Sequence, residues 1–153
     1  MTPKYTWLKI AEGEKGVKEI TGISSHTPRI LEYHAMTTLK AKQDEVPWCS
    51  SFVNWVMARA GYPITKSAAA KSWMKWGNEV PLQYGAVIIL KRKGGHHVGF
   101  YTGETTNSIY LLGGNQADAV NVKTFSKEII LSARMPKELN TTDQAIFDVV
   151  GIK

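Results

Sequence analysis

Cysteine is nearly absent from this sequence of 153 residues, which contains a single one, Cys49. A lone cysteine cannot form an internal disulfide, so assembly of the fold does not depend on an oxidising compartment. Long hydrophobic runs are also missing, since no stretch approaches the ~20 apolar residues that span a bilayer. Residues 1–10 lack the apolar core of a signal peptide. We therefore expect synthesis in the cytoplasm without a signal peptide, and no insertion into a membrane.

Other signals are missing as well. The sequence has no internal repeat, low-complexity run or Pro/Ser-rich linker, so we expect one domain over 1–153, with a core at about 7–136 and an extension over 137–153. The four histidines form neither a His-Glu-x-x-His pattern nor Cys/His pairs at ligand spacing, so neither a metal site nor a cofactor is predicted. The Gly-x-Ser-x-Gly pattern of serine hydrolases is absent too.

The charge is strongly positive, with a formal net value of +6. This excess indicates anionic partners, among which a bacterial envelope and nucleic acid are the two candidates. The lysines are scattered, the densest group being Lys91-Arg92-Lys93, and no zinc-finger or RNA-binding signature accompanies them. We therefore expect an envelope partner and no nucleic acid.

Hydrophobic spacing predicts helices in the first half of the chain and strands in the second. The expected helices cover 7–20, 28–39, 49–60 and 68–76, and the expected strands cover 85–90, 97–102, 108–112, 119–125 and 129–135. Short connections favour antiparallel hairpins, so the predicted class is α+β, with helices packed on one face of an approximately five-stranded antiparallel sheet. Residues 137–153 are expected to add a short helix capped by Thr142 or Asp143, or an edge strand.

Cys49 is the most informative residue, because it falls where a helix is predicted to begin. Pro47 interrupts any earlier helix, and apolar residues such as Phe52 and Val56 then recur at helical spacing until Gly61. The unpaired N–H groups at a helix N-terminus favour a thiolate over a thiol. Histidine and then a polar residue follow later in the chain, which is the order that a papain-like cysteine hydrolase needs.

The histidine is one of a pair, His96 and His97. Consecutive side chains of a strand project from opposite faces, so only one of the two can face the nucleophile. His97 shares a face with Gly99, which leaves space beside an imidazole. His96 is expected to lie in a solvated turn or to touch substrate.

Three segments together resemble the CHAP proteins, whose name abbreviates cysteine, histidine-dependent amidohydrolase/peptidase. They are Pro47-Trp48-Cys49 with its aromatic helix, Gly95–Tyr101, and Gly113-Gly114-Asn115-Gln116. The sequence is similar to a single-domain proteobacterial and phage branch related to NlpC-type peptidases. The resemblance implies a papain-like fold and cleavage of peptidoglycan, at an amide bond within the stem peptide or at its junction with the sugar.

The resemblance also implies roles for individual residues. Cys49 matches the family nucleophile, His97 the general base, and Asn115 the polar residue that orients the histidine, in this case by accepting from Nδ1–H. Many relatives place an acidic residue two positions before that asparagine, where this chain has Gly113. Asn115 also follows two glycines, so a turn-forming role is the alternative.

Three further residues are candidates for contact with substrate. Trp48 is expected to line the cleft, His96 to touch the substrate, and Gln116 to donate to a developing oxyanion, although the backbone N–H of Cys49 is the commoner donor.

The biological setting expected from these features is a phage endolysin that reaches the periplasm and cell wall after release by a holin. The alternatives are a secreted antibacterial toxin with an immunity protein, a cysteine acyltransferase with the same residues, and a catalytically silent wall-binding or phage structural module.

Overall fold

The computed structural model describes residues 3–19, 27–38 and 48–151. Helices come first and an antiparallel sheet follows, which confirms the predicted α+β class. The helices are α1 (Thr6–Gly13), α2 (Pro28–His34), α3 (Cys49–Arg59) and α4 (Thr141–Val150), with short 3₁₀ helices η1 (Ala70–Lys75) and η2 (Lys127–Ile129). The strands are β1 (Asn78–Glu79), β2 (Val87–Arg92), β3 (Gly95–Glu104), β4 (Ser108–Gln116), β5 (Ala119–Ser126) and β6 (Ile130–Met135). None of the helices in the described ranges is long and apolar enough to cross a membrane.

The sheet has the strand order β1-β6-β2-β3-β4-β5, and its neighbours pair antiparallel. The hairpins β2–β3, β3–β4 and β4–β5 follow the prediction. β6 departs from it, because η2 carries the chain to the far side of β2 instead of into a hairpin with β5. The additional strand β1 has only two residues, which is too short for a period of two to be visible in the sequence.

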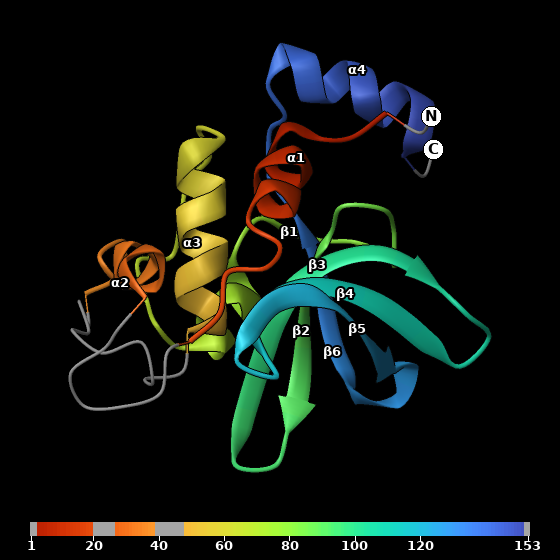
Figure 1. The fold of residues 1–153 in the computed structure, drawn as a ribbon. Coiled ribbons are helices and arrows are strands. Elements are labelled where there is room, and N and C mark those ends of the chain that lie inside the picture. The colour runs from red at the N-terminus through yellow and green to blue at the C-terminus, as the bar shows by residue number, and fades with distance from the viewer. Residues whose placement is uncertain (1–2, 20–26, 39–47, 152–153) are drawn as a thin grey trace.

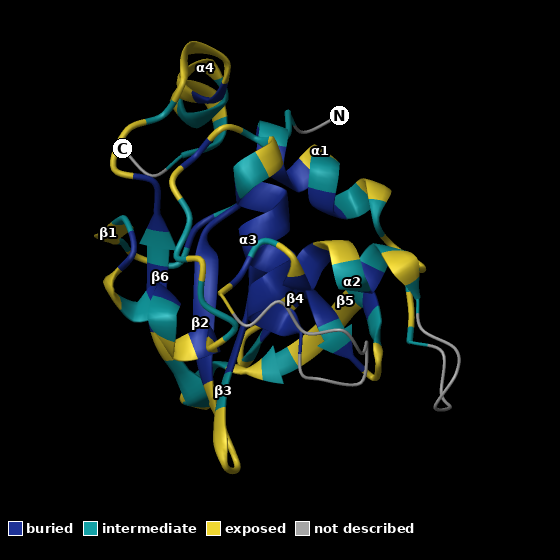
Figure 2. Ribbon diagram, turned by 90° about the vertical axis from the view of Figure 1, so that its left-hand side faces the viewer, coloured by how far each residue is buried: buried dark blue, intermediate teal, exposed yellow. Residues whose placement is uncertain are grey.

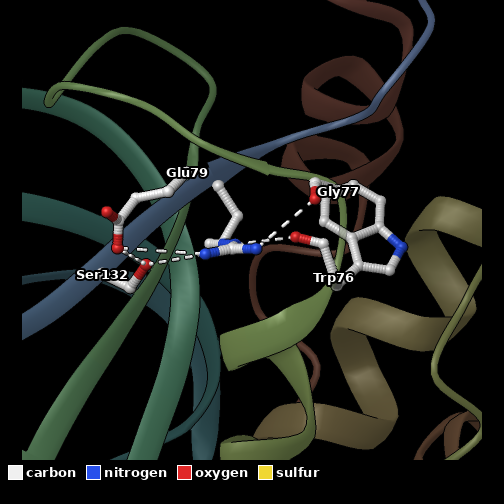
Figure 3. A network of polar contacts seen from close by, with 5 residues as sticks. Trp76, Gly77, Glu79 and Ser132 are labelled. Atoms are coloured by element: carbon white, nitrogen blue, oxygen red, sulfur yellow. Dashed lines mark hydrogen bonds and ion pairs between the residues drawn. The ribbon is translucent and has the colours of Figure 1, made fainter.

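β1 is attached to β6 by the guanidinium of Arg134. Arg134 Nε donates to the carbonyl of Trp76 at 2.7 Å, and Nη2 donates to that of Gly77 at 3.4 Å (Figure 3). The carboxylate of Glu79 lies 3.9 Å from Nη1 and accepts from Ser132 Oγ at 3.2 Å. This network ties the connection after η1 to the edge of the sheet.

α3 lies at the centre of the molecule. Figure 1 shows it with α1 and α2 on one side of the sheet, and it packs on β3 and β4. The nine residues 49–57 are all buried, so α3 is dark blue over most of its length in Figure 2. Burial on every side is typical of a helix that forms the core of a domain rather than its cover.

Buried polar side chains of α3 hold the neighbouring loop in place. Asn54 Oδ1 accepts from the backbone N–H of Thr65 at 2.9 Å, and its Nδ2 donates to the carbonyl of Ser67 at 3.0 Å. Ser50 Oγ donates to the same carbonyl at 2.7 Å and accepts from Trp73 Nε1 at 2.9 Å. Because buried polar groups need partners, these bonds fix the loop against the first turn of α3.

Several helix ends differ from the predictions. α1 ends at Gly13 rather than continuing to residue 20, and α2 ends at His34 rather than continuing to residue 39. α4 is the predicted C-terminal helix, but Asn140 caps it by accepting from the N–H of Asp143 at 2.8 Å, in place of the expected Thr142 or Asp143.

Asp143 has a different function, because its buried carboxylate joins α4 to the rest of the molecule. It accepts from the backbone N–H and the hydroxyl of Thr6, at 2.7 and 2.6 Å, and from the Tyr62 hydroxyl at 2.6 Å. Tyr5, the residue before α1, provides no side-chain cap, so the carboxylate of Asp143 caps α1 from a distant part of the chain.

Asp143→Ala should lower the free energy of unfolding by about 3 kcal/mol, because it leaves the partly buried donors of Thr6 and the buried hydroxyl of Tyr62 without an acceptor. Denaturant unfolding measures the change. The matched control is Asp148→Ala on the same helix, where the carboxylate is exposed and the expected change stays within about 0.5 kcal/mol. Equal small effects of the two substitutions would contradict the capping role.

Candidate active site

Cys49 is the first residue of α3, as the sequence predicts, and its exposed fraction is 7%. Its thiol lies within hydrogen-bonding reach of the backbone of Val98 and Ser50. Val98 directly follows His97 on β3. The start of the central helix therefore brings the only thiol of the chain against the strand that carries the candidate base.

The close approach of α3 to the sheet depends on Gly114 of β4. A Cβ at Gly114 would lie 2.6 Å from the Trp48 ring and 2.9 Å from Phe52 Cβ, closer than van der Waals contact allows. Trp48 is fully buried here, stacks on Tyr33 with ring centroids 5.8 Å apart, and donates from Nε1 to Glu19 at 2.7 Å. The expectation that Trp48 lines the cleft and contacts substrate is therefore corrected: its indole is part of the core.

His97 is 1% exposed and bonds to Gln116, with 3.0 Å between its Nε2 and Oε1 of the amide. The ring of Phe125 lies 5.4 Å from the imidazole, centroid to centroid. Burial lowers the pKa of His97 to about 4; the Gln116 hydrogen bond opposes this shift, while the charges of Arg92 and Lys123 add to it. The imidazole is therefore neutral at pH 7.

The orientation of the Gln116 amide fixes the tautomer of His97. Gln116 Nε2 donates to the carbonyls of Leu111 (3.1 Å) and Asn121 (2.8 Å) and to the side-chain oxygen of Asn121 (3.0 Å), so its Oε1 faces the imidazole. His97 Nε2 must then carry the proton, which leaves Nδ1 as the basic nitrogen.

This pairing corrects the expectation from the sequence in two respects. The residue that bonds to His97 is Gln116 rather than Asn115, and the ring nitrogen that it engages is Nε2 rather than Nδ1. Gly113 makes the contact possible, because a Cβ there would lie 2.6 Å from Gln116 Oε1. The amide of Gln116 thus lies over the backbone of Gly113, the position at which many CHAP relatives have an acidic residue.

Asn115 lies at the irregular end of β4, which leads into the turn to β5. Its φ of +56° lies in the left-handed region, as do those of Ala117 and Asp118 at +54° and +63°, a conformation that asparagine tolerates. The N-terminal segment holds this turn through backbone bonds from Glu19 N–H to the Asp118 carbonyl at 2.9 Å and from Val120 N–H to the carbonyl of residue 17 at 2.8 Å. Because this turn directs Gln116 toward His97, the N-terminal segment supports the site.

His96 lies beside the site but projects from the other face of β3. It is partly exposed and stands opposite Lys91 in the β2–β3 hairpin, whereas His97 stands opposite Leu90. Of the two imidazoles, only that of His97 bonds to Gln116.

The protonation of Cys49 differs from the thiolate that the sequence predicts. Burial raises the pKa of the thiol, and this effect outweighs the opposing contributions of the Val98 and Ser50 backbone and of Arg92. Among the described residues, no hydrogen bond joins the thiol to the imidazole, as is often so before substrate binds. At rest the Cys49 thiol and the His97 imidazole are therefore both neutral.

Comparison with known proteins bears on this arrangement. Residues 41–115 match the family model of the CHAP domain. This chain contains a CHAP domain. Its structure is similar to that of the peptidoglycan hydrolase RipB from Mycobacterium tuberculosis, with a TM-score of 0.54 and 20% sequence identity over 88% of this chain and 64% of the RipB chain. The chain thus spans less than two thirds of RipB, and the likeness is one of fold. No curated protein matches the sequence.

Cys49, His97 and Asn115 lie inside the segment that matches the CHAP domain, and Gln116 is the next residue beyond it. From the sequence, Gln116 is expected to contact the substrate as a donor to a developing oxyanion. The sequence signal that points to its role is Gly113, whose missing side chain leaves room for a long amide. The described ranges contain no group of three His, Cys, Asp or Glu residues that could hold a metal ion.

The low pKa of His97 makes the stability of the CHAP domain depend on pH. The unfolded imidazole takes up a proton near its ordinary value of 6.5, while the folded one does so near 4. Stability is therefore complete above pH 6.5 and falls as the pH drops toward 4, by ~3 kcal/mol for this group. His97→Gln should remove that part of the slope in unfolding curves recorded between pH 7 and 4.

His96→Gln is the matched control, because its imidazole is partly exposed and should leave the slope unchanged. If the stability of His97→Gln kept the full pH dependence of the wild type, the assignment of that dependence to His97 would be contradicted.

Proposed function

We propose that this CHAP domain is a peptidoglycan hydrolase that cleaves an amide bond of the stem peptide, or its junction with the sugar, with Cys49 as the nucleophile. The observation that carries the proposal is the juxtaposition at the start of α3. The thiol lies against Val98, and the preceding residue, His97, is oriented by Gln116. The CHAP match and the fold shared with the peptidoglycan hydrolase RipB support this substrate.

The reaction begins with transfer of the thiol proton to Nδ1 of His97 as sulfur attacks the amide carbonyl. The resulting imidazolium is stabilised by Gln116 Oε1, which accepts from Nε2–H. Collapse of the tetrahedral intermediate breaks the C–N bond, and the imidazolium gives its proton to the leaving amine. Water, deprotonated by the same imidazole, then hydrolyses the thioester and releases Cys49 as a thiol.

The oxyanion is held by the first N–H groups of α3. The side chain of Trp48 does not cap the helix, and the backbone of Cys49 and Ser50 lies close enough to the thiol to favour its charged form. The same N–H groups are therefore placed to stabilise negative charge on a carbonyl oxygen attacked by that sulfur.

Cys49→Ala should abolish hydrolysis while the fold survives, because the substitution removes only the sulfur of a buried side chain. The measurement is mass spectrometry of purified peptidoglycan after digestion with the wild type and with the variant. Soluble fragments are expected from the wild type alone, and their new termini identify the bond. Full release by Cys49→Ala would refute the thiol mechanism, and absence of fragments from both proteins would favour the silent wall-binding module.

Gln116→Ala should lower kcat by roughly 100-fold, because the imidazole loses the acceptor that fixes its tautomer. Asn115→Gly is the matched control at the adjacent position of β4, and its effect should stay within a few-fold, since glycine adopts the positive φ of that position. Gln116→Glu adds a readout that misfolding would not produce. A carboxylate favours the imidazolium, so the acid limb of kcat/KM moves to higher pH. A larger loss in Asn115→Gly than in Gln116→Ala would restore Asn115 as the orienting residue.

For the biological setting we retain the endolysin role expected from the sequence, in which a holin gives the enzyme access to the wall. The formal net charge of +6 supports an anionic wall as the partner.

A further inference from the structure

Arg92 projects from the same face of the sheet as His97. Opposed residues of an antiparallel pair share a face, and His97 stands opposite Leu90 while the next pair on that face is Arg92 with Gly95. Gly95 has no side chain, and a Cβ built there would meet no atom within 4 Å. Arg92 is exposed, at the end of a hairpin that Figure 2 shows projecting from the body of the molecule with an exposed tip. The space over Gly95, two residues before His97 on the same face, is therefore open and bordered by a guanidinium.

Lys123, on β5, is the second cation whose charge acts on His97. It stands opposite Leu111 of β4, and the Leu111 side chain occupies the space over Gly99, where a Cβ would lie 2.7 Å from its Cγ. Gly99 is two residues after His97 on β3, so Lys123 and His97 share a face. Phe125, two residues after Lys123, contacts the imidazole directly. The ammonium group of Lys123 is exposed beside that contact.

Neither cation has an acidic partner among the residues that the structure describes. The ion pairs found there engage other basic residues, namely Lys4, Arg29, Lys127 and Arg134. The hairpin segment 87–103 contains three basic residues and no Asp or Glu. Both charges reach the site, since Arg92 and Lys123 each lower the pKa of His97. The charges of Arg92 and Lys123 thus act on His97 without an acidic partner among the described residues.

We propose that Arg92 and Lys123 bind a carboxylate of the substrate next to the scissile amide, so that the preferred substrate is an anionic peptide. The inference rests on the proposed hydrolase function and adds to it the residues that select the substrate. A guanidinium binds a carboxylate through two parallel hydrogen bonds, and an ammonium adds a point charge from the other side. The same peptide with that carboxylate amidated would leave both cations without a partner.

The test compares two muropeptides that differ only in whether the acid next to the cleaved bond is a carboxylate or a carboxamide. Initial rates give kcat and KM for the wild type, Arg92→Gln, Lys123→Gln and the double variant. The wild type should have a KM roughly 10-fold lower for the carboxylate form, and the double variant should lose this preference. Arg92→Lys, which keeps the charge without the paired donors, should keep part of it.

Lys93→Gln is the matched control, because it removes one exposed charge from the tip of the same hairpin and should keep the full preference. Equal KM values of the wild type for the two muropeptides, or an unchanged preference in the double variant, would overturn the inference while cleavage itself upholds the hydrolase. Absence of cleavage of either muropeptide by the wild type would overturn both.

Discussion

The structure depends on one close approach, that of the start of α3 to β4 at Gly114. The Trp48 ring and Phe52 Cβ occupy the space that a side chain at Gly114 would need. A single methyl group there would push the helix from the sheet, and it would separate the Cys49 thiol from the backbone of Val98. Because α3 is buried on every side, the rest of the core would have to move with it.

The second constraint is electrostatic, and it follows from the first. Tight packing buries both Cys49 and His97, and burial disfavours the charged form of each, so the resting pair is neutral. A carboxylate beside the imidazole would oppose this by stabilising the imidazolium. The chain instead presents the amide of Gln116, which fixes the tautomer through an acceptor oxygen without adding a charge. The tautomer of His97 is thereby fixed without a negative charge that would raise its pKa. Gly113 provides the room for the Gln116 amide.

Much of this arrangement could be predicted from the sequence, because its signals are local. The helix start at Cys49 follows from a proline and helical spacing. That His97 and not His96 bonds to Gln116 agrees with the alternation of side chains along β3. The role of Gln116 could not be predicted, since it depends on a register shift between β4 and β5 and on left-handed residues in the turn. The capping of α1 by Asp143 was equally invisible, because 137 positions separate it from Thr6 in the chain.

The two cations beside the site also affect how readily the neutral His97 accepts a proton. Arg92 and Lys123 lower the pKa of His97, which weakens it as a base while the site is empty. A substrate carboxylate held between them would offset their charge and raise the basicity of the imidazole while the scissile amide is in place. Arg92 also lowers the pKa of Cys49, and this effect too would be reduced by the bound carboxylate. Substrate binding would therefore strengthen His97 as a base while the thiol stays protonated, as expected for a reaction in which proton transfer to His97 accompanies attack.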